Sequence, residues 1–121
     1  MESKDHMLFT GKKVETIVDD GEGLSSFYVA WLDAGGYFAI DIENDDNTIF
    51  CEFNDQSNGF YSKTLKYAMN GRRIKFWVSV DEYFDRTNRI NEIDIVIPDK
   101  EFDIKEISSC LEFIFSTANA T

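Results

Sequence analysis

Four carboxylates crowd into residues 41–46, and carboxylates at such spacing can hold a divalent cation. With Asp41 as the first position of a calcium-binding loop, Glu43 and Asp45 fall at the third and fifth positions. Glu52 falls at the twelfth. The sixth position requires glycine for its sharp turn, but Asp46 stands there, and the flanking residues alternate like strands instead of helices. The spacing therefore favours a solvated hairpin loop without a bound metal.

The reactive side chains on which small enzymes depend are scarce in this chain. His6 is the only histidine and lies in a polar end, which argues against a histidine triad or a histidine metal cluster. Neither Cys51 nor Cys110 has a candidate base in the sequence, and glycine-rich phosphate loops, nucleophile elbows and Cys-x-x-Cys motifs are missing. A carboxylate pair for glycoside hydrolysis stays open on spacing alone. We therefore predict a binding protein, without a cofactor, instead of an enzyme.

The acidic charge is concentrated in one half of the chain. The net charge is -11, and residues 1–60 hold thirteen Asp/Glu against three Lys/Arg, whereas residues 61–121 hold ten against nine. Such a field repels nucleic acid and anionic lipid and attracts a basic protein surface. The partner is therefore predicted to be a basic protein, not a nucleic acid or a membrane. The alternative is that the acidity only aids solubility.

A second candidate for recognition is the acidic segment 81–85, which carries two aromatic residues. Tyr83 and Phe84 lie between Asp81-Glu82 and Asp85, and aromatic side chains in such loops often anchor protein interfaces. The equally plausible alternative is that one of the two rings belongs to the core.

Hydrophobic periodicity predicts which elements position these residues. Alternation with period two indicates strands, and Asn70-Gly71 between two alternating runs indicates a type I′ hairpin. Near Asp103, which resembles a helix cap, the apolar spacing becomes helical. The sequence therefore predicts an α+β fold, an antiparallel β-meander of six to eight strands with one C-terminal amphipathic helix packed on it. The expected strands cover 8–18 (as one strand or a pair), 27–32, 37–42, 49–53, 61–69, 74–80 and 93–97, and the helix covers 104–115.

Length and composition predict a single domain over residues 1–121. The first residues lack the apolar stretch of a signal peptide, so we expect a cytoplasmic protein. Cys51 and Cys110 are then expected to be reduced thiols in the core.

The segment 50–61 carries a resemblance to a known family. Glu52 is followed by Asp55-Gln56, then by Gly59 and Tyr61, and more strands and a closing helix come after it. This order resembles the tenth immunity-protein family of bacterial polymorphic toxin systems, the type found in contact-dependent inhibition. The resemblance covers roughly residues 37–115. The same residues also allow a purely structural interpretation, a hairpin connection in which Asp55 caps turn amides and Gly59 adopts positive φ.

The resemblance implies an immunity protein that binds a cognate toxin, a nuclease in the most common case, and blocks its basic cleft with carboxylates. A rival hypothesis is a ligand-binding or enzymatic β-rich domain with a pocket between sheet and helix, and a third is a structural subunit. A flat acidic patch with exposed aromatics favours immunity, whereas a buried pocket lined by convergent polar groups favours the rival. The residues predicted to contact the toxin are Asp41, Glu43, Asp45, Asp46, Glu52, Gln56, Tyr83 and Phe84.

Overall fold

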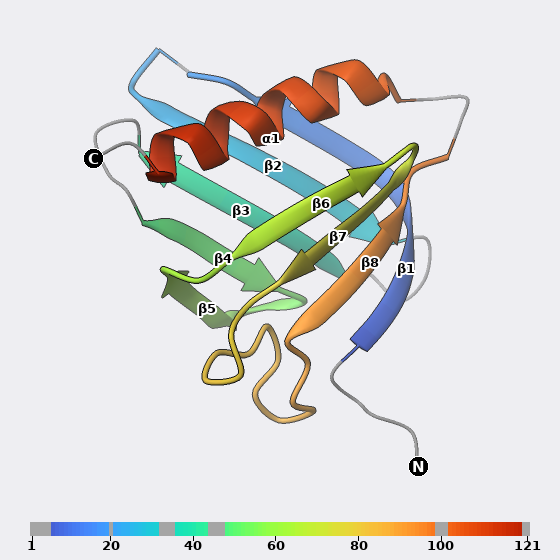
Figure 1. Cartoon of the computed structure of the whole chain (residues 1–121), viewed down its shortest axis with the longest axis vertical. Coiled ribbons are helices and arrows are strands. Elements are labelled where there is room, and N and C mark those ends of the chain that lie inside the picture. Colours follow the sequence, from blue (N-terminus) through green and yellow to red (C-terminus); the bar gives the residue numbers. More distant parts are fainter. Residues whose placement is uncertain (1–5, 20, 32–35, 44–47, 99–101, 120–121) are drawn as a thin grey trace.

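Eight strands form one sheet, and a single helix follows them in the chain (Figure 1). The computed structural model describes residues 6–19, 21–31, 36–43, 48–98 and 102–119. The strand order is β5-β4-β3-β2-β1-β8-β7-β6. The bounds of the elements are β1 (His6–Ile17), β2 (Leu24–Trp31), β3 (Tyr37–Glu43), β4 (Ile49–Phe53), β5 (Asp55–Ser62), β6 (Lys66–Asn70), β7 (Arg73–Trp77), β8 (Glu92–Val96) and α1 (Ile104–Asn119).

The predicted α+β class is confirmed, but the sheet is mixed and does not form one continuous meander. β1 to β5 follow one another as antiparallel neighbours, as do β6 to β8, and β8 joins the two groups by lying parallel to β1. β1 serves both groups, because residues 6–10 pair with β8 and residues 11–17 pair with β2. The register shifts between Gly11 and Lys13, and a Cβ on Gly11 would lie 3.0 Å from Cγ2 of Val29. A glycine at this irregularity lets one strand pass from one group to the other.

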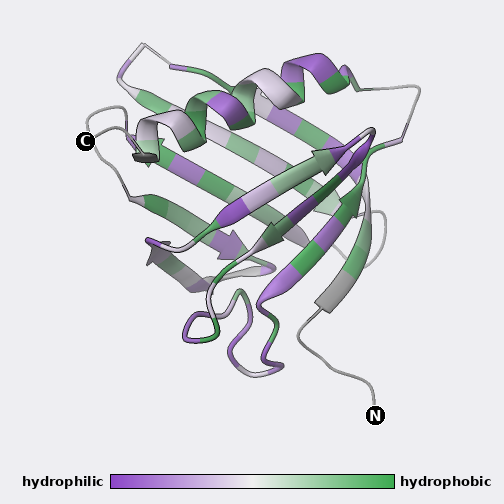
Figure 2. Cartoon of the chain, viewed as in Figure 1, coloured by the Kyte–Doolittle hydropathy of each residue, from purple (hydrophilic) through white to green (hydrophobic). Residues whose placement is uncertain are grey.

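The two groups of strands face each other across a shared core, with β6–β8 lying over β2–β5 (Figure 1). Phe76 of β7 packs on Phe38 of β3 and Phe27 of β2, with ring centroids 4.8 and 5.9 Å apart. Buried and partly exposed positions alternate along β2, β3 and β4, whose hydropathy is shown in Figure 2. One face of every strand in this region therefore points into the core and the other points away from it.

Helix α1 begins where the sequence predicts. The carboxylate of Asp103 accepts hydrogen bonds from the backbone N–H groups of Lys105 and Glu106, at 2.9 and 3.4 Å, as an N-cap does. Ile107, Leu111 and Ile114 are buried, and Phe115 packs against Tyr67 of β6 at a centroid distance of 4.5 Å. The helix thus contacts β1, β2 and β3 and reaches across to the edge strand β6.

Two turns differ from their predicted form. The expected strand 61–69 is broken, because β5 ends at Ser62 and the Ser62 hydroxyl accepts hydrogen bonds from the N–H groups of Thr64 and Leu65. This turn carries Leu65 into the core. The hairpin at Asn70-Gly71 exists, but Asn70 pairs with Arg73. Gly71, with φ of 60°, is therefore the first central residue, as in a type II′ turn instead of type I′.

Candidate functional site

The outer face of β2–β5 brings acidic and aromatic side chains together. Phe38, Ile40 and Ile42 point into the core, so the intervening residues of β3 point outward. Cross-strand register places Ser26, Asp41, Phe50 and Tyr61 in one row across four strands. We call this surface the acidic–aromatic face, and it consists of Tyr28, Tyr37, Asp41, Glu43, Phe50, Glu52 and Tyr61.

The aromatic residues of this face form two pairs. Tyr28 and Tyr37 stack with centroids 5.7 Å apart, and Phe50 meets Tyr61 at 5.0 Å and 61°. Tyr61 is 67% exposed. Paired rings are rigid and present a large apolar surface at little cost in side-chain entropy, which suits them to anchor a partner.

The carboxylates of this face are close enough to repel one another. Asp41 lies diagonally across from Glu52, and burial together with the charge of Glu52 raises the pKa of Asp41 above its ordinary value. The hydroxyl of Tyr37 donates a hydrogen bond of 2.7 Å to Glu52. Among the described residues, no lysine or arginine forms an ion pair with Asp41, Glu43 or Glu52. The face therefore carries negative charge that the described part of the chain leaves uncompensated.

Asn54 fixes the geometry at one end of this face. Its carbonyl oxygen accepts hydrogen bonds from the indole N–H of Trp31 and the backbone N–H of Tyr37, both at 2.9 Å. Its φ of 62° makes it the turn between β4 and β5. A Cβ on Gly36 would overlap the Trp31 ring, so glycine is required there. Tyr37, and through it the hydrogen bond to Glu52, is thereby held in place.

The interpretation of residues 55–59 as a hairpin connection is wrong. Asn54 alone makes the connection, and Asp55, Gln56 and Gly59 lie within β5. The side-chain amide of Asn58 donates a 2.9 Å hydrogen bond to the carbonyl of Phe53, which ties the two strands together.

Only part of the predicted contact set lies on the acidic–aromatic face. Asp41, Glu43 and Glu52 are brought together there, whereas Asp45 and Asp46 lie outside the described residues. Gln56 lies in β5, but its side chain is outside the described part.

In the segment 81–85, Phe84 belongs to the core and Tyr83 lies at the surface. Phe84 is fully buried against Phe38 and Phe53, so its assignment to a partner contact is wrong and the core alternative holds. Tyr83 is partly exposed in the loop between β7 and β8, and no described contact joins it to the acidic–aromatic face. The neighbouring Glu82 accepts hydrogen bonds of 2.6 Å from the hydroxyls of Ser62 and Thr64 and so holds the turn before β6.

Sequence reasoning missed Tyr28, Tyr37 and Phe50. Each of the three stands one position from a residue that the structure buries, namely Phe27, Phe38 and Cys51, so strand alternation places it on the outer side. Phe50 and Glu52 stand two positions apart in β4 and so share its outer side. The segment 27–32 is apolar throughout, however, and this hid the outward position of Tyr28.

Both thiols are unreactive near neutral pH. Cys51 and Cys110 are free and buried, as predicted. Burial raises the pKa of Cys51, with smaller contributions from the charges of Glu82 and Asp41. Burial also raises the pKa of Cys110 to about 11, although its contact with the carbonyl of Ile17 acts in the opposite direction. Burial therefore favours the protonated thiol over the thiolate at both positions.

Two hollows are lined entirely by described residues and bear on the rival hypotheses. One of about 150 Å³ opens on the acidic–aromatic face between Asp41, Glu43, Phe50 and Tyr61. Another of about 160 Å³ lies between α1 and β1, where Asp103 already caps the helix. Both are smaller than the roughly 300–1,000 Å³ of typical small-ligand sites. No group of three metal-ligating side chains occurs among the described residues. Within that same part of the chain, no helix has the length and apolarity needed to cross a bilayer.

No protein-family model, curated protein or solved structure matches this chain. The resemblance to the tenth immunity-protein family therefore stays a prediction, and a function has to be argued from the site itself.

Proposed function

We propose that this chain is an immunity protein that binds and neutralises a basic toxin domain through its acidic–aromatic face. One observation carries the proposal. Two aromatic pairs flank Asp41 and Glu52, with Tyr61 exposed and the other three rings partly exposed. These two carboxylates have no cationic partner in the described part of the chain. Rings of this kind anchor a partner by excluding water, and the carboxylates select a basic one.

The mechanism we propose is occlusion. A toxin that cleaves nucleic acid needs a basic cleft for phosphates, and a surface of carboxylates can occupy the same cleft. The excess of ten negative charges in residues 1–60 would attract a basic toxin and raise the rate of association. The protein would act in the cytoplasm by binding alone, with no chemical step of its own.

Two further observations support a protein partner over a small ligand. The hollow on the face has a volume of only about 150 Å³, and two of its lining side chains, Glu43 and Tyr61, are exposed. The aromatic and acidic residues extend beyond it, from Tyr28 on β2 to Tyr61 on β5. An extended surface of mixed rings and charges has the composition expected of a protein interface.

Co-expression with the toxin domain encoded directly upstream tests the proposal. We expect the chain to restore growth and to co-purify with the toxin. Glu43→Lys should weaken binding by about tenfold, which corresponds to roughly 1.4 kcal/mol, and should flatten the salt dependence of association.

Glu112→Lys on α1 is the matched control, because it is exposed and changes the net charge by the same amount away from the face. If both variants weaken binding equally, only the overall charge matters and the face is not the interface. If the wild-type chain neither rescues growth nor binds the toxin, the proposed function is wrong.

A further inference from the structure

The hollow on the acidic–aromatic face is lined by two carboxylates and two aromatic rings, and Leu24, Ile42 and Thr48 complete the lining. Asp41 and Glu43 lie two residues apart on the same side of β3, and Phe50 and Tyr61 come from β4 and β5. Asp41 is the cross-strand partner of Phe50, and Phe50 is the partner of Tyr61. A carboxylate and two rings therefore stand in one row, with the second carboxylate beside them.

Such walls select the chemical class of the occupant. The face of an aromatic ring attracts a cation, and a carboxylate pairs with it directly. An anion would be repelled by both carboxylates, and a neutral apolar group would leave them desolvated without a hydrogen bond. The hollow is thus suited to a positively charged group.

The arrangement of the rings further favours a guanidinium over an ammonium group. A guanidinium is planar, stacks on aromatic rings and offers paired N–H donors to carboxylate oxygens, whereas an ammonium is a compact and strongly hydrated point charge. The rings of Phe50 and Tyr61 meet at 61° and are not stacked on each other, and both line the hollow together with Asp41 and Glu43. We propose that this hollow receives the guanidinium of an arginine side chain of the toxin. The inference rests on the proposed function and specifies the contact that anchors the complex.

The site can be probed without the toxin. The probe is N-acetyl-arginine amide, whose guanidinium is its only charge, titrated into ¹⁵N-labelled protein. N-acetyl-citrulline amide has nearly the same shape without the charge and is the matched control. We expect saturable amide shifts at residues 41–43, 50 and 61 with the arginine analogue and none with the citrulline analogue. Equal shifts from both analogues would overturn the cation site, and equal affinity for N-acetyl-lysine amide would overturn the preference for guanidinium.

Two variants connect the hollow to the toxin. Tyr61→Ala and Asp41→Asn should each weaken binding of the arginine analogue and of the toxin by about three- to tenfold. Glu112→Gln on the exposed side of α1 should change neither. If the toxin still binds both variants as tightly as it binds the wild type, the inference fails while the proposed function stands. If the arginine analogue binds as expected but the toxin is neither bound nor neutralised, the proposed function fails instead.

Discussion

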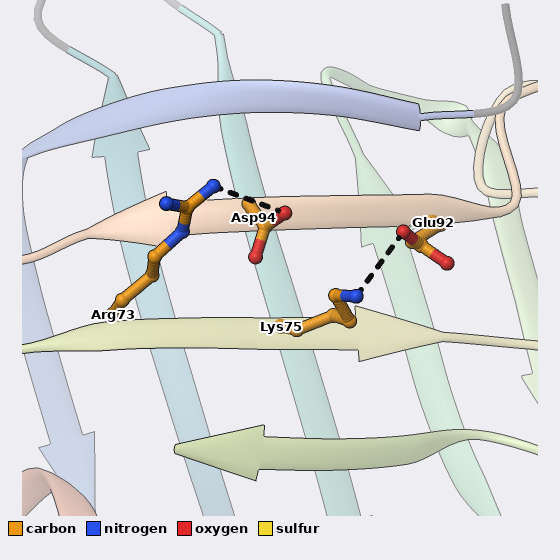
Figure 3. A network of polar contacts seen from close by, with 4 residues as sticks. All are labelled: Arg73, Lys75, Glu92 and Asp94. Carbon is orange, nitrogen blue, oxygen red and sulfur yellow. Dashed lines mark ion pairs between the residues drawn. The ribbon is translucent and has the colours of Figure 1, made fainter. Parts of the chain in front are cut away.

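The carboxylates on the outer side of β3 and β4 differ from those on the outer side of β7 and β8 in whether a cation of the same chain pairs with them. On β7 and β8, Arg73 lies 3.5 Å from Asp94 and Lys75 lies 3.5 Å from Glu92 (Figure 3). Asp94 is only 3% exposed, so its charge is almost fully removed from water. On the acidic–aromatic face, Asp41 has no such partner among the described residues and has Glu52 as its charged neighbour.

This difference indicates which of the two faces has its carboxylates compensated by cations of the same chain. A buried carboxylate is tolerated when a cation of the same chain compensates it, and β7 supplies that cation to β8. β2 to β5 contribute carboxylates and aromatic rings but no lysine or arginine at all. Among the described residues, the carboxylates of β3 and β4 are therefore uncompensated, whereas those of β8 are paired. The uncompensated face is the better candidate for a partner.

The largest expected effect comes from breaking the core on which both faces depend. Ile114 is fully buried in α1, and Ile114→Asp would place an unpaired carboxylate there. We expect a loss of about 3–5 kcal/mol in the free energy of unfolding, a large fraction of the roughly 5–15 kcal/mol by which a typical domain is stable. Chemical denaturation followed by circular dichroism measures it, with Ser109→Asp on the exposed side of the same helix as the control. Wild-type stability for Ile114→Asp would mean that α1 is not docked on the sheet.

The docking of α1 could be predicted because helical and strand periodicities are local signals. The positions of Ile107, Leu111 and Ile114 in the core follow from spacing alone. The parallel contact between β1 and β8 could not be predicted, because it joins residues 6–10 to 92–96 and leaves no local pattern. The same limit applies to the candidate site.

Within the candidate site, carboxylates could be found from their spacing, but their neighbours depend on register. That Asp41 lies beside Phe50, and Phe50 beside Tyr61, is decided by the turns and bulges that set the alignment of three strands. Phe84 shows that neighbouring residues in the sequence can also suggest the wrong environment for a side chain. Its acidic neighbours suggest a surface loop, but the ring fills the core beneath it.

The second-largest expected effect concerns the outer side of β7 and β8, where the carboxylates are paired with cations. Asp94→Asn keeps the shape of the side chain but removes its charge from Arg73, so we expect a loss of about 1–3 kcal/mol in stability. Glu92→Gln is the matched control, because the Lys75–Glu92 pair has the same 3.5 Å separation but remains partly exposed. Its loss should stay below about 1 kcal/mol. Equal losses for the two variants would show that burial does not distinguish the two ion pairs.

The smallest expected effect is a gain in stability instead of a loss, and it concerns Asp41. Because burial and the charge of Glu52 raise its pKa above 3.8 in the folded protein, folding favours the protonated form. Its contribution to stability is therefore fully present below pH 3.8 and is lost as the pH rises through the folded-state pKa. Asp41→Asn cannot ionise, so the variant should gain stability relative to the wild type as the pH rises over this range. The gain should stay below about 1 kcal/mol, because the side chain is partly exposed to solvent.

Urea denaturation of both proteins between pH 3 and pH 7 measures this difference. Repeating the comparison in a Glu52→Gln background separates the two causes of the raised Asp41 pKa, burial and the charge of Glu52. Glutamine removes the repelling charge but keeps an acceptor for the Tyr37 hydroxyl. The gain from Asp41→Asn should then shrink, and the part that remains is due to burial. A difference independent of pH would mean that Asp41 is compensated as Asp94 is, and the contrast between the two faces would no longer point to a cationic partner. A gain that grows with pH, together with weaker toxin binding by Asp41→Asn, would mean that the carboxylate favours recognition at the expense of stability.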